Sequence, residues 1–226
     1  TKSTQSFNNK FGVPLSLFNI KKNDKYAVLE AGMDKAGEID ILTKIIKPNF
    51  GVITNISYAH IKNFKSLTEI AKAKSEIINN ITKGGKIVLN KDDDYFNFIK
   101  KIALKKDIKV ISFSKKNNLA DIYIKKIISS KQNSRIFVNV KNTKKSFLIK
   151  KNLLPYLHNF LASVAIISEL YDLKNIDEKL FYNFKLPLSR GDITKIRLKN
   201  KLIYFTDESY NSNPLSLKSA IKNFDK

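Results

Sequence analysis

Short apolar runs alternate with longer segments of helical spacing between residues 26 and 114, and this alternation constrains the fold more than any other feature. Short uninterrupted apolar runs are typical of buried strands, and helical spacing predicts amphipathic helices. Strands are expected at residues 26–32, 50–56, 86–90 and 109–114, with helices at 39–46, 66–81 and 92–106. Consecutive strands separated by a helix are joined by crossover connections and run parallel. The predicted fold class is therefore α/β, a mostly parallel sheet with crossover helices.

Local signals set the ends of two of these helices. Lys47 and Pro48 stop the first helix, because the residue before a proline is pushed out of the α conformation. Ser66 and Glu69 form a capping-box pattern at the start of the second helix, in which each side chain accepts a backbone hydrogen bond. The glycine pair at 84–85 is expected to mark the end of that helix.

The pattern changes after residue 120. Alternating apolar and polar side chains, joined by polar turns, predict a small antiparallel meander at 120–129, 135–140 and 146–151. An apolar helix is expected at 157–173 and a hairpin at 195–208, with its turn near Lys199 and Asn200.

A domain boundary is expected near residues 187–191, where the pattern changes again. Residues 1–187 would form a central domain, and residues 188–226 would begin a C-terminal α/β domain.

The chain is strongly basic, with a formal net charge of +22. Such a charge ordinarily indicates nucleic-acid binding, and a basic nucleic-acid-binding domain stays an alternative interpretation. However, the basic residues are nearly all lysine, spread along the chain, and the only arginines are Arg135, Arg190 and Arg197. Proteins that read grooves and phosphates favour arginine forks. We therefore expect no nucleic-acid partner, whereas an anionic substrate such as a nucleotide suits the charge.

The absence of cysteine excludes disulfides and thiolate metal sites and is compatible with a reducing compartment. An apolar fraction of 42% supports a hydrophobic core. No continuous apolar run approaches the roughly 18 residues that span a bilayer, and the polar stretch that opens at Thr1 is unlike a signal peptide. We therefore expect a cytoplasmic protein without membrane insertion.

Polar residues follow the predicted strands, at the edge of the sheet where α/β proteins bind ligands. Glu30 ends the first run, His60 follows the second, and Asn90, Asp92 and Asp93 follow the third. Each has a structural alternative, because a carboxylate or amide can hold a turn and a lone histidine is often structural. The functional interpretation of Glu30 and His60 is that they lie at one edge and bind Mg²⁺ beside a phosphate.

Five segments carry a family pattern. They are SFNNKFGVPLSL at 6–17, GMDKAGEID at 32–40, TNISYAH at 54–60, IAKAKSEI at 70–77 and DESYNSNP at 207–214. Together they resemble the Mur ligase family, whose ATP-dependent members join amino acids or peptides to a nucleotide-linked muramic acid. The resemblance runs from Thr4 to about Ala220. Its specific part is the pairing of NNxxGVP with DExYNxNP, since either motif alone would be weak.

The resemblance implies a metal site with catalytic function. Glu30 matches the acidic residue of the family's E-x-G stretch, and His60 closes its NI-x-x-AH motif; both are implicated in binding Mg²⁺. Lys74 matches the lysine that the family carbamylates, although its spacing alone would suit a helix surface. A carbamate presents a carboxylate-like oxygen pair that can bind the metal beside the ATP phosphates. Desolvation would favour the neutral amine that reacts with CO₂.

Further matches concern the adenine of ATP. His158 and Asn159 match the family's HN motif, whose ring and amide hold the adenine, although they could simply begin a buried helix. The sequence departs from some relatives in having Ala162 where they have a second asparagine.

The remaining matches surround the nucleotides. The residues implied on the nucleotide side are Arg190, Asp207, Tyr210 and Asn211, and those near the muramoyl nucleotide are Asn8 and Asn9. Arg190 precedes its glycine where the family has the reverse order, and Glu208 replaces the usual second aspartate.

The family's phosphate-binding loop, G-x-x-G-K-[ST] before a helix, has no match in the seven residues before NNKFGVP. We expect that loop and a uridine-binding domain upstream, and most of a C-terminal domain downstream. The chain is therefore interpreted as an internal part of a longer enzyme that does not turn over by itself.

The paired motifs narrow the implied activity to the addition of D-alanyl-D-alanine to UDP-N-acetylmuramoyl-tripeptide in peptidoglycan precursor synthesis. The implied cofactors are ATP and Mg²⁺, and the longer enzyme is expected to be a monomer. One alternative is another ligase of the superfamily, such as the one that adds the third residue or folylpolyglutamate synthase. The other, from a different class, is the basic nucleic-acid-binding domain.

Overall fold

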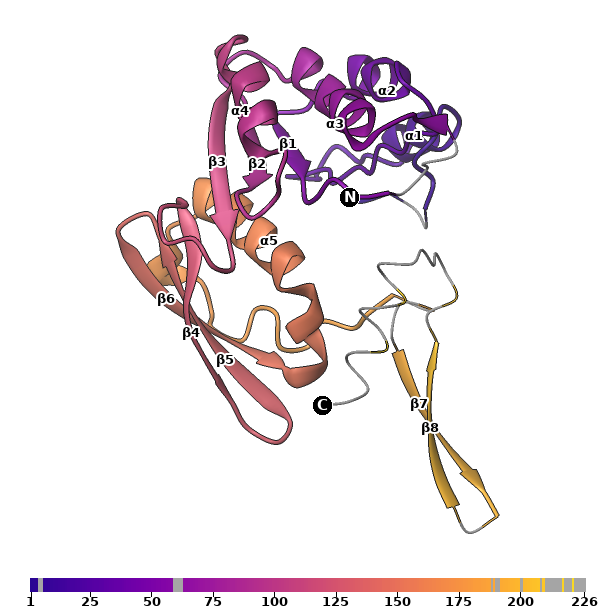
Figure 1. Ribbon diagram of the computed structural model, residues 1–226, viewed down its shortest axis with the longest axis vertical. Helices are drawn as coiled ribbons and strands as arrows, with labels where there is room; N and C mark the ends of the chain where they lie inside the picture. The colour runs from indigo at the N-terminus through magenta and orange to yellow at the C-terminus, as the bar shows by residue number, and fades with distance from the viewer. Residues whose placement is uncertain are drawn as a thin grey trace. The chain divides into compact units, whose positions relative to one another are not determined.

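Three parallel strands form the first half of the main sheet (Figure 1). They are β1 (Phe50–Ile53), β2 (Lys86–Asn90) and β3 (Lys109–Ser114). β2 lies in the middle, with Leu89 opposite Ile53 on one side and opposite Ser112 on the other. Ile87 and Leu89 are almost completely buried, as expected for a strand of a parallel sheet. The predicted parallel α/β sheet is confirmed.

The computed structural model describes residues 1–3, 6–58, 63–187, 189, 192–199, 201–207, 209, 217 and 221. The chain forms two compact units that alternate along the sequence. The first contains Thr1–Lys126, Phe137–Lys145 and His158–Ile176, and the second contains Ile127–Ile136, Ser146–Leu157 and Asp177–Lys226. The domain boundary expected near residue 187 stays a prediction.

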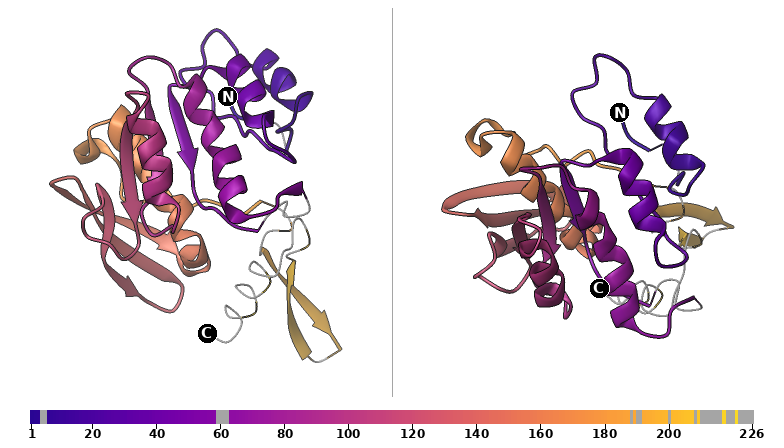
Figure 2. Two further views of the ribbon diagram at one scale, coloured as in Figure 1. Left: turned by 45° about the horizontal axis from the view of Figure 1, so that its top comes forward. Right: turned by 90° about the horizontal axis from the view of Figure 1, so that it is seen from above.

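Helices connect the parallel strands as predicted: α3 (Leu67–Ser75), which continues as a 3₁₀ helix (Glu76–Asn80), lies between β1 and β2, and α4 (Phe96–Leu104) lies between β2 and β3. The predicted helix α2 (Glu38–Ile46) precedes β1. α4 lies alongside β2 and β3 (Figures 1 and 2). At the start of α3, the hydroxyl of Ser66 accepts from the backbone N–H of Glu69 at 3.3 Å, so this half of the capping box is confirmed. The carboxylate of Glu69 instead accepts from the backbone N–H of Lys65.

Two hydrophobic clusters hold these helices in place. In the first, Ile99 of α4 packs with Ile78 of the 3₁₀ helix against Leu89 of β2. The second surrounds α2 and α3 and contains Met33, Ile39, Phe64, Ile70 and Ala73. Ile56 and Ile77 pack against both clusters, so the two form one continuous core.

The prediction of a buried strand at 26–32 is wrong. A single parallel bridge joins Val28 to Lys2, and 69% of Val28 is exposed. The backbone of Val28 exchanges hydrogen bonds with Thr1 and Ser3, and these keep the segment extended. This bridge leaves the side chain of Val28 exposed, so an apolar run alone does not make a buried strand.

The predicted meander continues the main sheet rather than forming a separate one. Its strands are β4 (Ile122–Ser129), β5 (Asn133–Val140) and β6 (Thr143–Lys150), and the sheet order is β1-β2-β3-β4-β5-β6. The short connections within β4–β6 suit antiparallel neighbours. β3 pairs with β4 in parallel, Phe113 with Ile122 and Ser114 with Tyr123. Because the end of β3 meets the start of β4, the connection only steps sideways and needs no crossover helix.

The apolar helix α5 (Leu157–Leu170) follows a 3₁₀ helix (Lys151–Tyr156). Together they give a 20-residue helical stretch with mean hydropathy 1.3, long and apolar enough by composition to cross a membrane. The apolar helix expected at 157–173 is confirmed as α5, and the 3₁₀ helix before it extends the helical stretch beyond any continuous apolar run. Leu161, Val164 and Ala165 of α5 are completely buried inside the protein, as in the core helix of a globular domain.

The second unit contains the predicted hairpin, formed by β7 (Asp192–Leu198) and β8 (Lys201–Asp207). The strands are antiparallel, with Leu198 opposite Lys201 next to the turn and Asp192 opposite Asp207 at the other end. The hairpin prediction is therefore confirmed, and it places Asp207 at the end of a strand.

Candidate active site

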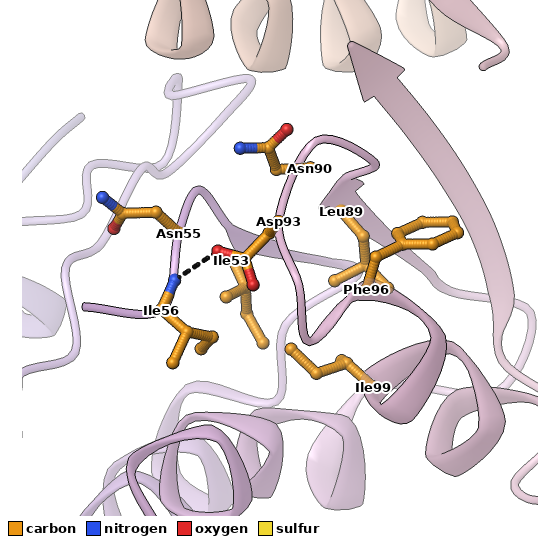
Figure 3. A pocket seen from close by; sticks show the side chains of 8 residues that line it. All are labelled: Ile53, Asn55, Ile56, Leu89, Asn90, Asp93, Phe96 and Ile99. Atoms are coloured by element: carbon orange, nitrogen blue, oxygen red, sulfur yellow. Dashed lines mark hydrogen bonds between the residues drawn. The ribbon is translucent and has the colours of Figure 1, made fainter. Parts of the chain in front are cut away.

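The loop that follows β1 is fastened to the turn that follows β2. The side-chain amide of Asn90 donates to the carbonyl oxygen of Thr54 at 3.0 Å. Oδ2 of Asp93 accepts from the backbone N–H of Ile56 at 2.7 Å (Figure 3). Asn90 and Asp93, with Asn55 and Phe96 among others, line a small pocket between these two loops. The side chains of Asn90 and Asp93 therefore hold the two loops together, which agrees with the structural alternative for these residues. A contact of either side chain with a ligand stays a prediction.

Lys74 of α3 lies against the loop after β1. Its Nζ donates to the backbone carbonyl of Asn55 at 2.9 Å. Lys74 is half-buried, whereas Lys72 on the same helix is exposed. Burial lowers the pKa of Lys74 below its ordinary value of 10.5, and the carboxylate of Asp93 opposes this shift only in part. A lowered pKa increases the share of neutral amine, which is the form that reacts with CO₂.

Glu30 is held by a residue of the NNKFGVP stretch. Nδ2 of Asn8 donates to Oε1 of Glu30 at 2.9 Å. The backbone carbonyl of Asn8 also accepts from the N–H of Gly32 at 2.7 Å. Two motifs that are separate in the sequence, NNxxGVP and E-x-G, therefore meet at one place in the first unit.

The neighbouring Asn9 has a different task. Its Oδ1 accepts from the backbone N–H groups of Phe11 and Gly12, each at 3.0 Å. These two residues stand at the start of helix α1 (Gly12–Phe18). Asn9 thus uses its acceptor to hold a helix terminus, and its expected role near the muramoyl nucleotide stays a prediction.

Glu30 has the donor chemistry that Mg²⁺ prefers. A carboxylate offers several lone pairs, and the hydrogen bond from Asn8 occupies one of them. Lys74 in its ammonium form has no lone pair and would fit a metal only as a carbamate. Within the described part of the chain, no three or more His, Cys, Asp or Glu side chains are grouped to hold a metal. His60 lies outside the described residues.

A second cluster surrounds His158, near the start of α5. The His158 ring packs against Phe113, with ring centroids 6.4 Å apart. Its Nε2 lies 3.4 Å from Oδ2 of Asp92, which accepts from the hydroxyl of Ser114 through its other oxygen. The ring is therefore held beside the ends of β2 and β3. Asn159 follows it and is exposed.

His158 is kept neutral by its surroundings. Burial lowers its pKa below 6.5, and the charge of Lys115 lowers it further, against the opposing effect of Asp92 and Asp93. Burial would raise the pKa of Asp92, but hydrogen bonds from Ser114, the Lys115 backbone and His158 outweigh it, so this pKa is below 3.8. A neutral ring that donates from Nε2 to a carboxylate presents an acceptor at Nδ1.

Asp207 lies in the second unit, where it accepts two hydrogen bonds. The hydroxyl of Ser189 donates to Oδ2 of Asp207 at 2.7 Å, and the backbone N–H of Ser209 donates to Oδ1 at 3.0 Å. Hydrogen bonds from Ser209 and Ser189 lower the pKa of Asp207 below 3.8. The other predicted residues on the nucleotide side, Arg190, Tyr210 and Asn211, lie outside the described residues and their roles stay predictions.

Sequence reasoning did not single out Asp92 and Ser114 as partners of His158. Asp92 stands in a run of three aspartates, which by composition is a solvated turn, and it lies 66 residues before His158 in the sequence. The position of Asp92 directly after a predicted strand places it at the ligand-binding edge with Asn90 and Asp93, but it does not indicate His158 as its partner.

The fold and these clusters define an α/β protein whose polar side chains gather just beyond its parallel strands, where enzymes of this class bind their ligands. Residues 1–167 match the family model described as the Mur ligase middle domain. The chain therefore belongs to the Mur ligase family.

Similar proteins agree with this assignment. The chain is 38% identical over 224 residues to UDP-N-acetylmuramoyl-tripeptide–D-alanyl-D-alanine ligase of Buchnera aphidicola subsp. Baizongia pistaciae, covering 96% of this chain and 46% of the relative. The crystal structure of MurF from Acinetobacter baumannii is 28% identical with a TM-score of 0.84, covering 98% of this chain and 47% of that one.

A third similar protein is the MurF ligase from Thermotoga maritima, solved in complex with ADP. It shares the fold, with a TM-score of 0.78 at 21% identity, and the match covers 98% of this chain and 49% of that one. The chain spans about half the length of the curated relatives it matches, such as the Buchnera ligase.

Proposed function

We propose that this chain is the central part of a cytoplasmic, ATP-dependent ligase that adds D-alanyl-D-alanine to UDP-N-acetylmuramoyl-tripeptide. Membership of the Mur ligase family and similarity to curated ligases of that name support the proposal. The observation that carries it is the half-buried amine of Lys74, whose pKa is lowered and which is held against the loop after β1. This is the state that a lysine needs in order to react with CO₂.

The proposed reaction has two steps. The terminal carboxylate of the tripeptide takes the γ-phosphoryl group of ATP, which gives an acyl phosphate and ADP. The amine of D-alanyl-D-alanine then attacks the acyl carbon, and the tetrahedral intermediate loses a proton and inorganic phosphate to leave an amide. Both steps place negative charge on phosphoryl oxygens, so the site must stabilise charge there.

The residues of this chain would divide the work. Glu30, the carbamate of Lys74 and His60 would hold Mg²⁺, which neutralises phosphoryl charge when bound. His158 and Asn159 would hold the adenine, with the His158 ring kept neutral so that it offers an acceptor. The ADP bound by the Thermotoga maritima relative supports a nucleotide at this fold.

Phosphate release by the full-length protein that contains this chain tests the proposal. Release should require ATP, the UDP-linked tripeptide and D-alanyl-D-alanine together. Lys74→Ala should lower kcat by about a hundredfold or more, the order of loss when a group that stabilises transition-state charge is removed. The matched control is Lys72→Ala, an exposed position on the same helix, which should stay within about twofold of wild type.

Three other outcomes would change the assignment. Phosphate release with a single amino acid in place of the dipeptide would indicate another ligase of the superfamily. Full activity of Lys74→Ala, with or without added bicarbonate, would rule out the carbamate. Tight, salt-dependent binding to DNA or RNA without phosphate release would favour the nucleic-acid-binding alternative.

A further inference from the structure

Asn8 contacts the Glu30 motif in three ways. Its Nδ2 donates to Oε1 of Glu30 at 2.9 Å, and its backbone carbonyl accepts from the N–H of Gly32 at 2.7 Å. Its side chain also fills the space beside Gly32, where a Cβ would lie 2.7 Å from Cγ of Asn8. Real Cβ atoms do not approach other atoms so closely, so the Asn8 amide and a larger residue at position 32 exclude each other.

We propose that Asn8 is a positioning residue that fixes the carboxylate of Glu30 for Mg²⁺, and that Gly32 is small so that Asn8 can do this. The proposal rests on the proposed function, because it takes Glu30 as a metal ligand. The resemblance to the family implies a different role for Asn8, a position near the muramoyl nucleotide. Partners that orient metal ligands commonly change metal affinity by about 10- to 100-fold when they are removed.

The direction of the hydrogen bond is fixed by chemistry. An ionised carboxylate can only accept, so the Asn8 group that faces Glu30 must be its NH₂. Aspartate at position 8 would lose this donor, but it would also place a second carboxylate beside Glu30 that could itself bind a divalent cation. Asn8→Ala removes the donor without adding a charge, so it is the variant that tests the interaction.

Asn49 provides a matched control outside the candidate site. Its Nδ2 donates to Oγ1 of Thr82 at 3.0 Å, so it uses the same donor group as Asn8 but not toward Glu30. Asn49 is exposed and stands directly before β1, whereas the candidate site follows the strands. The same Asn→Ala change should therefore be harmful at position 8 and harmless at position 49.

The main experiment measures Mg²⁺ dependence and substrate dependence separately in the full-length protein. For Asn8→Ala, the Mg²⁺ concentration that gives half-maximal phosphate release should rise about tenfold, with little change in the KM for the UDP-linked tripeptide. Asn49→Ala should leave both values unchanged. A raised KM for the tripeptide with an unchanged Mg²⁺ requirement would overturn the proposal and place Asn8 at the substrate.

A second measurement does not depend on turnover. Mn²⁺ can replace Mg²⁺ as a paramagnetic probe, and its binding is followed by electron paramagnetic resonance without substrates. Asn8→Ala should weaken Mn²⁺ binding about tenfold and Asn49→Ala should not. If wild type binds Mn²⁺ but catalyses no ligation, the proposed function fails while this inference survives. Equal binding by wild type and Asn8→Ala, or no binding by wild type, would overturn the inference.

Gly32→Ala tests the steric part. Its Cβ would displace the Asn8 amide from Glu30, so the variant should show the same rise in metal requirement as Asn8→Ala. The double variant should be no worse than either single change, because both remove one interaction. Independent, multiplying effects of the two changes would contradict the proposal.

Discussion

At the scale of residues, loss of water governs the two ionisable groups Lys74 and His158. Burial is the first cause of the lowered pKa in each case, and the carboxylate of Asp93 opposes both shifts. Asp93 also accepts from the backbone N–H of Ile56, so its position is fixed. The carboxylate of Asp93 therefore limits how far the pKa values of Lys74 and His158 are lowered, and so limits the neutral share of both side chains.

The charges that face His158 give a prediction with two opposite signs. Asp92→Asn removes an anion that raises the pKa of His158, so this pKa should fall further. Lys115→Met removes a cation that lowers it, so the pKa should rise. Histidine NMR titration measures both, and this chain contains only two histidines. Shifts of the same sign in the two variants would mean that these charges do not act directly on the ring.

The lowered pKa of His158 determines how the stability of the protein should depend on pH. Because the pKa of His158 in the folded protein lies below 6.5, the unfolded chain takes up this proton more readily. The contribution of the neutral ring is present above pH 6.5 and is lost as the pH falls through the folded-state pKa. Asp92→Asn should extend this loss to lower pH.

At the scale of elements, α3 carries Lys74 and depends on its cap. Ser66→Ala removes the hydroxyl that accepts from Glu69, and should lower the free energy of unfolding by about 1 kcal/mol. Urea unfolding measures this, and Ser163→Ala at an exposed position of α5 is the control, expected within about 0.5 kcal/mol of wild type. An equal loss in both variants would show that the cap is not the cause.

The elements that the sequence predicted well are those whose burial follows from their own pattern. β2 and β3 read as apolar runs between turn residues, and they occupy the expected residues. The segment 26–32 has the same pattern but lacks cover, which depends on distant residues. α4 begins at Phe96, later than expected, because Asp93 accepts from the backbone N–H of Tyr95 and holds a turn there.

The sequence predicted individual residues of the candidate site but not the contacts between them. The match to the family indicates Lys74 and His158, and Glu30 is indicated both by that match and by its place at the end of a predicted strand. Their contacts, Asn8 with Glu30 and Asp92 with His158, join residues 22 and 66 positions apart. Periodicity reports only which side of an element is buried, so pairs this distant appear only once the elements are packed.

At the scale of the whole molecule, the main effect of the excess of lysine is to destabilise the folded state by electrostatic repulsion. A net charge of +22 repels itself in the compact state. Some of it is paired, as where Lys86 and Lys141 share the carboxylate of Glu169, whose side chain is only 5% exposed. Ion pairs with a buried member are screened less by salt than exposed charges are.

Salt should therefore stabilise this protein. Raising the ionic strength from about 0.01 M to about 0.15 M shortens the Debye length from about 30 Å to about 8 Å and screens the repulsion among exposed lysines. The urea midpoint should rise, by an amount that corresponds to about 1 kcal/mol. NaCl and KCl should act alike, because the effect is one of screening. A falling midpoint would mean that attractive pairs outweigh the repulsion.

Three side chains hold the loop after β1, and each of them contacts the backbone of that loop. Asn90 reaches the carbonyl of Thr54, Asp93 reaches the N–H of Ile56, and Lys74 donates to the carbonyl of Asn55. Every residue type supplies a backbone carbonyl, so these three bonds place little demand on which side chain stands at position 55. These contacts depend on the path of the backbone and not on the side chains of the loop. The sequence of the loop can therefore change while the Lys74 amine keeps its position.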